Sequence, residues 1–173
     1  SSPLPGRQAL RLFEILREIV PSLFLWSRTG AAFSENPLWE VKLQPSTLPS
    51  RKSTRQIFIG PVAVGGGAPV VVQSMTKTDT RNVAGTVAQI RRLERAGCEV
   101  VRVAVPDGEA ARKLGEIRKK IAIPLIADIH FDYRLALEAL DQGVAGLRLN
   151  PGNIGRRERV AQVVKAARER KVP

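Results

Sequence analysis

Hydrophobic and polar positions follow two different periods along the chain, and the first 49 residues stand apart from the rest. The stretch "QALRLFEILREIV" places Leu12, Ile15, Leu16 and Ile19 on one helical face, with charged residues between them. This spacing predicts one amphipathic helix. The residues after it show no period, so we expect residues 1–50 to form a poorly ordered extension.

From residue 51 onward the pattern becomes rich in β-branched residues. Two short runs lie around Gly65–Gly67, and Val70–Gln73 is expected to be a longer strand. The simplest interpretation is a hairpin followed by that strand. We interpret the glycine triplet as a turn, because no phosphate-loop lysine follows it.

Beyond Thr76 a strand–helix unit repeats. Helices are expected over Asn82–Ala96, from Asp107 to about Lys120, from Asp132 to Gln142, and from Ile154 to about Lys171. Strands are expected over Glu99–Val105, 123–129 and 146–150, with another beginning near Val172. Asp107 and Asp132 are typical N-caps, and Gly97 and Gly143 are typical residues after a helix. The repetition predicts a parallel sheet.

Such a sheet belongs either to a doubly wound fold or to a TIM (β/α)8 barrel. Alternate strand residues share a face, so Arg102 lies with Ala104, Asp128 with His130, and Arg148 with Asn150. The aliphatic neighbours of these residues point the other way. One polar face along three strands favours a barrel whose interior becomes a binding site at its C-terminal rim.

The residues of that predicted rim indicate anion binding. Two inward guanidinium groups, of Arg102 and Arg148, are costly unless an anion meets them, and Arg matches phosphate or carboxylate geometry. The alternative is a structural network in which Asp128 neutralises both arginines. His130, the only histidine, can donate a proton or a hydrogen bond there, and Asn150 can orient hydroxyl groups. Amides around Gly152–Gly155 are a candidate for a further phosphate oxygen.

Composition excludes several classes of protein. The chain has 173 residues and 43% apolar residues, without an uninterrupted apolar run near the length of a spanning helix. The single Cys98 excludes an internal disulfide framework and a metal site built from several thiolates of this sequence. Cys98 lies near the N-terminal end of its strand, and no G-x-S-x-G motif is present, so nucleophilic catalysis has little support.

The net charge of +12 raises the alternative of a basic nucleic-acid-binding protein. Residues 51–173 hold 23 Lys and Arg against 12 Asp and Glu, mostly on predicted helix faces. Because no basic run is interleaved with aromatic residues, we favour solvated helix faces. We therefore expect neither a nucleic-acid nor a membrane partner.

Five segments together resemble one enzyme family. They are "RKSTRQIFIG", "GGAPVVVQSMTKTDT", "LERAGCEVVRVAVP", "PLIADIHFDYRLAL" and "LRLNPGNIG". In this order they are similar to the N-terminal part of 4-hydroxy-3-methylbut-2-enyl diphosphate synthases of the non-mevalonate pathway of isoprenoid (terpenoid) biosynthesis. The resemblance extends from Arg51 to the last residue.

The resemblance implies an iron–sulfur oxidoreductase of the bacterial cytoplasm. Such enzymes convert 2-C-methyl-D-erythritol 2,4-cyclodiphosphate to the linear enyl diphosphate by a two-electron reductive ring opening with loss of water. They bind the substrate in a TIM barrel, and a C-terminal domain holds a 4Fe-4S cluster through three cysteines and a glutamate. Electrons come from flavodoxin or ferredoxin, and the bacterial enzyme is a homodimer.

The resemblance also assigns site residues. Arg102 of "VVRV" and Arg148 of "LRLN" match positions that grip the diphosphate, while Asp128, His130 and Asn150 match residues lining the same pocket. No catalytic residue is assigned. The runner-up is another phosphate-binding barrel enzyme, acting on a pterin or a sugar phosphate.

Length limits what this sequence is expected to do. A whole TIM barrel takes about 250 residues. The only methionine is Met75, and the sequence stops where a strand would begin. We therefore expect residues 51–173 to be the first half of the barrel, and the cluster ligands to lie outside this sequence. The polypeptide alone is expected to be inactive, and its open sheet edges to make it prone to aggregation.

Overall fold

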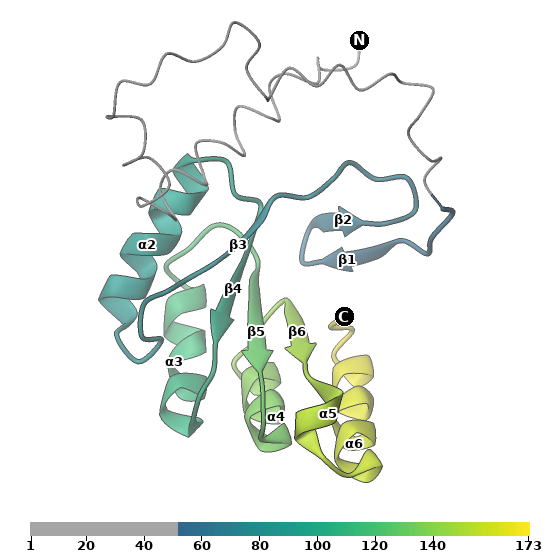
Figure 1. The fold of residues 1–173 in the computed structure, drawn as a ribbon. Coiled ribbons are helices and arrows are strands. Elements are labelled where there is room, and N and C mark those ends of the chain that lie inside the picture. Colours follow the sequence, from purple (N-terminus) through teal and green to yellow (C-terminus); the bar gives the residue numbers. More distant parts are fainter. Residues whose placement is uncertain (1–51) are drawn as a thin grey trace, which may run out of the picture.

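A computed structural model describes residues 52–173. The predicted extension, residues 1–50, lies outside the described residues, as does its amphipathic helix. The described chain begins with a short hairpin, continues into a parallel sheet, and covers one face of that sheet with helices (Figure 1). Within residues 52–173 no helix combines the length and apolar character that crossing a membrane requires.

The sheet has four parallel strands in sequence order. They are β3 (Gln73–Met75), β4 (Val100–Ala104), β5 (Leu125–Ile129) and β6 (Gly146–Leu149). Each new strand is added on the same side of the previous one, and no strand order reverses. A doubly wound sheet would reverse its order at a switch point and cover both faces. The monotonic order and one-sided helical cover (Figure 1) therefore confirm the barrel prediction, as four strands of a TIM-barrel sheet.

The helices follow the strands closely. They are α2 (Val83–Arg95), α3 (Gly108–Arg118), α4 (Tyr133–Asp141), α5 (Pro151–Ile154) and α6 (Arg157–Glu169). The predicted caps are confirmed: the Asp107 side chain accepts a hydrogen bond from the Ala110 N–H, and Asp132 accepts one from the Arg134 N–H. Asn82 caps α2 in the same way, through the Gly85 N–H.

The core lies between the sheet and these helices. Ile90, Leu114 and Ile117 point inward from α2 and α3, and Val101 and Val103 meet them from β4. All five are fully buried, which is the side-chain alternation expected for β4. The opposite face of the strands carries Arg102, Asp128 and Arg148 beside a few apolar residues such as Val100 and Ile126.

The hairpin turns at a different glycine from the expected ones. Its strands are β1 (Ile57–Ile59) and β2 (Val62–Val64), joined through Gly60 and Pro61. Gly60 has φ of +56°, and glycine is preferred at the first central position of a type II′ hairpin turn. Gly65–Gly67 follow the hairpin and form a turn of their own, as expected for the triplet. A Cβ at Gly60 would contact Pro124 and Ala145, so the hairpin packs on the N-terminal ends of β5 and β6.

The strand expected at Val70–Gln73 was placed wrongly. The ladder begins only at Gln73, because the Val72 N–H donates to the Glu99 side chain over 2.8 Å. The Val72 carbonyl still accepts from the Glu99 N–H. A side chain thus replaces the first rung that the apolar run would have formed.

The prediction of one continuous helix from Ile154 to about Lys171 was also wrong at its start. The chain forms the four-residue α5, breaks at Gly155 with φ of +89°, and restarts as α6. The strand expected near Val172 is not assigned. However, the Pro173 carbonyl accepts a hydrogen bond from the Leu147 N–H, as a strand beside β6 would.

Candidate anion site at the carboxyl ends of the strands

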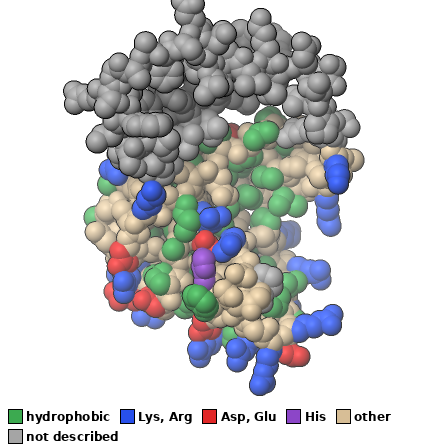
Figure 2. All heavy atoms as spheres, viewed as in Figure 1, with side chains coloured by type: hydrophobic (Ala, Val, Ile, Leu, Met, Phe, Trp, Pro, Cys, Tyr) green, Lys and Arg blue, Asp and Glu red, His purple; other side chains and the backbone are tan. Residues whose placement is uncertain are grey.

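Strand register brings the predicted rim residues onto one face of the sheet. Asp128 of β5 lies opposite Arg148 of β6 and Ala104 of β4. Arg102 precedes Ala104 by two residues and therefore shares its face. Side chains on the inner face of three neighbouring strands thus meet at Asp128. Figure 2 shows the single histidine, in purple, among blue and red side chains on this uncovered face.

Asp128 is the centre of the cluster. Its Oδ2 lies 3.3 Å from Arg102 Nε, its Oδ1 accepts a hydrogen bond of 3.0 Å from Arg148 Nη1, and the same Oδ1 lies 3.4 Å from His130 Nε2. His130 Nε2 is also 3.4 Å from Arg148 Nη1. One carboxylate therefore serves two guanidinium groups and the imidazole.

Arg102 keeps unused hydrogen-bonding capacity. Its contact with Asp128 is an ion pair without hydrogen-bond alignment, so the buried Nε has no hydrogen-bond partner among the described residues. Its Nη2 donates only to the sulfur of Met75, a weak acceptor, over 3.4 Å. Buried donors of a charged group favour an acceptor that satisfies them.

Exposure separates the two interpretations of the arginines. The Asp128 side chain is 3% exposed, whereas those of Arg102 and Arg148 are 30% and 43% exposed. The network of two arginines and one carboxylate is thus observed, but both guanidinium groups remain partly exposed to solvent. It presents an excess positive charge to solvent, which a phosphate or carboxylate can reach.

Asn150 lies where β6 ends and α5 begins. It leaves β6 as the N-cap residue of α5, and within residues 52–173 its side chain forms no hydrogen bond to the Asp128 cluster. The amides of Asn153 and Ile154 donate to the Asn150 carbonyl over 3.1 and 3.2 Å. The phosphate contact at Gly152–Gly155 stays a prediction; α5 has a single turn, and two of these amides already donate to the Asn150 carbonyl.

Phe131 is a feature of the rim that the sequence reasoning missed. Its side chain follows His130, is 72% exposed, and lies with its ring centroid 6.0 Å from that of His130. An apolar cavity of about 230 Å³ lies beside it, between the ends of β4 and β5. An aromatic residue directly after the last polar strand position was the available signal.

A second missed feature is a pair of matched loops. Asp79 and Arg81 follow β3, Asp132 and Arg134 follow β5, and in each pair the guanidinium grips the carboxylate through Nε and Nη2. The Arg81 side chain holds the pKa of the Asp79 carboxyl below its usual value, and Arg134 does the same to the pKa of Asp132. The repeated Asp-x-Arg spacing after a strand was the available signal.

Two further predictions concern Cys98 and metals. Cys98 is buried before β4, donates to the Val100 carbonyl over 3.1 Å, and has a thiol pKa raised by burial, as suits a structural cysteine. Among the described residues no group of three or more His, Cys, Asp or Glu could hold a metal ion. This part of the chain therefore does not fit an iron–sulfur cluster.

Comparison with known proteins gives one family. The GcpE TIM-barrel domain family matches residues 54–173. A protein of Thermodesulfovibrio yellowstonii named 4-hydroxy-3-methylbut-2-en-1-yl diphosphate synthase (flavodoxin) is 64% identical over 123 residues, which are 71% of this chain and 35% of the relative. Proteins of the same name from Dehalococcoides mccartyi and Geobacillus kaustophilus are both 60% identical to this chain. The aligned segments are 72% and 71% of this chain and 36% and 33% of the two relatives.

The chain thus spans about a third of the length of these curated relatives. Among solved structures, mandelate oxidase with a bound difluoro acid has 17% identity and a TM-score of 0.41, covering 60% of this chain and 41% of that one. A likeness this low carries no inference about function.

Proposed function

We propose a function from the premise that this chain belongs to the GcpE TIM-barrel domain family. Its rim holds the diphosphate of 2-C-methyl-D-erythritol 2,4-cyclodiphosphate, in an enzyme that opens this ring reductively to 4-hydroxy-3-methylbut-2-enyl diphosphate for isoprenoid biosynthesis. The carrying observation is that Arg102 and Arg148 face the open side of the sheet and share a single buried carboxylate.

The described residues supply binding and orientation in this proposal. Arg102 and Arg148 take the diphosphate oxygens, because a guanidinium fork matches phosphate better than any other side chain. Asp128 fixes both guanidinium groups before the ligand arrives, which lowers the entropy lost on binding. His130 and Asn150 stand beside the anion and orient the hydroxyl groups of the ligand. We assign no catalytic residue.

The remaining parts of the proposal concern the whole enzyme. It is an iron–sulfur oxidoreductase of the bacterial cytoplasm and a homodimer. A 4Fe-4S cluster, held by residues other than the described ones, would supply the electrons for ring opening. The relatives carry flavodoxin in their names, which supports flavodoxin as the donor, with ferredoxin as the alternative. In this division of the enzyme, residues 1–50 are an appended extension.

A chimera tests the proposal. Residues 54–173 of this chain replace the matching segment of the T. yellowstonii relative, and turnover of the cyclic diphosphate is measured with a chemical reductant. Arg148→Lys and Arg102→Lys are expected to raise KM about tenfold or more, because lysine keeps the charge but loses the bidentate hydrogen bonds. Arg168→Lys, on the exposed side of α6, is the control and should leave KM unchanged.

Two results would overturn the proposal. One is a folded, cluster-loaded chimera that binds no cyclic diphosphate. The other is an unchanged KM in both rim variants, which would return Arg102 and Arg148 to a purely structural network.

A further inference from the structure

The loop between β3 and α2, residues 76–82, is fastened to the neighbouring strand and helix. Thr76 N–H donates to the Arg102 carbonyl over 3.0 Å, and the Thr80 hydroxyl donates to the Ala104 carbonyl over 2.6 Å. At its other end Thr86 donates to the Asp79 carbonyl over 3.1 Å. The loop is therefore fastened to the C-terminal part of β4, through the carbonyls of Arg102 and Ala104.

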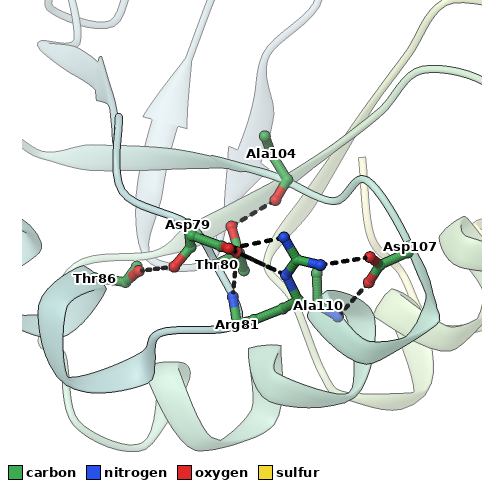
Figure 3. A network of polar contacts seen from close by, with 7 residues as sticks. All are labelled: Asp79, Thr80, Arg81, Thr86, Ala104, Asp107 and Ala110. Carbon is green, nitrogen blue, oxygen red and sulfur yellow. Dashed lines mark hydrogen bonds and ion pairs between the residues drawn. The ribbon is translucent and has the colours of Figure 1, made fainter.

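Arg81 extends this fastening to the next helix, as Figure 3 shows. Its Nε and Nη2 grip the Asp79 carboxylate at 2.8–3.1 Å, while its Nη1 lies 3.3 Å from Asp107 Oδ2. The other oxygen of Asp107 accepts the Ala110 N–H over 2.9 Å and caps α3. We call the chain of contacts Asp79–Arg81–Asp107–Ala110 the Arg81 bridge. It joins two consecutive loops of the rim.

The matched loop after β5 shows what the bridge adds. Arg134 grips Asp132 with nearly the same distances, 2.8–3.1 Å, but within residues 52–173 it forms no ion pair with a second acid. Its side chain is 76% exposed, whereas that of Arg81 is 44% exposed. The local Asp-x-Arg turn thus forms without a bridge, and the contact with Asp107 is a separate feature.

Exposed ion pairs contribute little to stability, so stability does not account for the bridge. The position of the bridge does account for it, because the loop that it fixes directly follows Met75, the last residue of β3. Met75 pairs with Arg102 in the sheet, and its sulfur accepts from Arg102 Nη2. We propose that Arg81 is a positioning residue, which ties residues 76–82 to the first turn of α3 and thereby holds the end of β4, with Arg102, in the arrangement that receives the diphosphate. This inference rests on the proposed function.

The first test needs no ligand and uses the complete 173-residue chain. Hydrogen exchange is measured for Arg81→Gln, Arg134→Gln and the unsubstituted chain. Arg81→Gln should accelerate exchange both in residues 79–82 and in the first turn of α3, whereas Arg134→Gln should accelerate it only around residues 132–135. An unchanged first turn of α3 in Arg81→Gln would disprove the bridge.

Asp107→Asn separates the bridge from the helix cap, because an asparagine oxygen still accepts the Ala110 N–H. This variant should loosen residues 79–82 less than Arg81→Gln does, because the Asp79–Arg81 pair remains, and the double variant should be no looser than Arg81→Gln alone. Additive effects would mean that Arg81 and Asp107 act independently, which contradicts the bridge.

The second test measures steady-state kinetics in the chimera described above. Arg81→Gln is expected to raise KM for the cyclic diphosphate roughly two- to tenfold with kcat unchanged, while Arg134→Gln leaves both unchanged. If KM rises in Arg148→Lys but not in Arg81→Gln, the positioning role of Arg81 is wrong and the proposed function is still supported. Unchanged KM in Arg81→Gln and in both rim variants, Arg102→Lys and Arg148→Lys, would reject the proposed function and this inference together.

Discussion

Asp128 organises the rim because no other Asp or Glu within residues 52–173 is buried, and its neighbours Arg102 and Arg148 are positively charged. Its carboxylate contacts Arg102 of β4, Arg148 of β6 and His130, which follows β5, at 3.0–3.4 Å. A buried carboxylate without partners would be costly, and so would the guanidinium groups without it. The cluster is therefore a unit, in which each charge depends on the others.

Removal of the Asp128 carboxylate should lower the stability of the protein, because every charged group of the cluster contacts it. Asp128→Ala is expected to lower the free energy of unfolding by about 1–3 kcal/mol, because two partly buried arginines lose their charged acceptor. Asp141→Ala, which breaks the exposed pair with Arg170, is the control and should cost less than about 1 kcal/mol. Urea unfolding of the three proteins measures both. Equal costs would mean that Asp128 contributes no more than a surface pair.

Strand parity explains which site residues the sequence could predict. Arg102, Asp128 and Arg148 occupy alternate positions of strands whose other face is aliphatic, so their convergence follows from the pattern alone. Asn150 was harder, because it lies where β6 has already ended and the alternation no longer applies. Arg81 could not be found this way, since its contact with Asp107 joins two loops 26 residues apart.

At the scale of elements, the division of the last helix depends on Gly155. Its φ of +89° and ψ of −121° lie in a region that only glycine enters without strain. The hydrophobic period of residues 154–171 runs straight through this position, so the pattern predicted one helix. Backbone conformation at a single residue was the missing information.

Gly155→Ala should therefore destabilise the protein by about 1–3 kcal/mol, because alanine is strained in this conformation. Gly152→Ala, within the helix α5 that ends just before Gly155, is the matched control. It has ordinary helical φ, and a Cβ there would only meet Asn150 Oδ1 at 3.6 Å. Thermal unfolding compares the two; a Gly155→Ala protein as stable as the Gly152→Ala protein would contradict this explanation of the break.

The other elements were predictable to within a few residues because caps and periodicity agreed. The Asp107 and Asp132 caps fixed two helix starts, and Gly97 and Gly143, at φ of +93° and +78°, follow the ends of α2 and α4. The start of β3 was not predictable, since it depends on the Glu99 side chain reaching Val72 across 27 residues.

At the scale of the whole molecule, the two kinds of positive charge are separated. Arg102 and Arg148 lie on the inner face of the sheet with Asp128, whereas many other basic residues lie on exposed helix surfaces, for example Arg157, Lys165 and Arg168 on α6. Inner and outer charges should therefore respond differently to salt, since only the outer ones are fully screened.

Salt titration distinguishes the two surfaces. Any binding of duplex DNA by the outer charges should fall by orders of magnitude, on the order of 10³ or more, between 50 and 200 mM salt. It should not depend on Arg148. Affinity of the chimera for the cyclic diphosphate should fall much less over the same range, yet respond to Arg148→Lys. DNA affinity that survives 200 mM salt and needs Arg148 would reverse this assignment.

The hairpin has a consequence for how a ligand moves. By packing Gly60 against Pro124 and Ala145, it covers the amino ends of β5 and β6, opposite the end where Asp128 and its partners lie. In the proposed enzyme the hairpin obstructs the amino-end side under β5 and β6, so the ligand reaches and leaves the arginines at the carboxyl ends of these strands. Substrate and product then share one route, so a product still held by the arginines blocks the next substrate, and the release rate sets an upper limit on turnover.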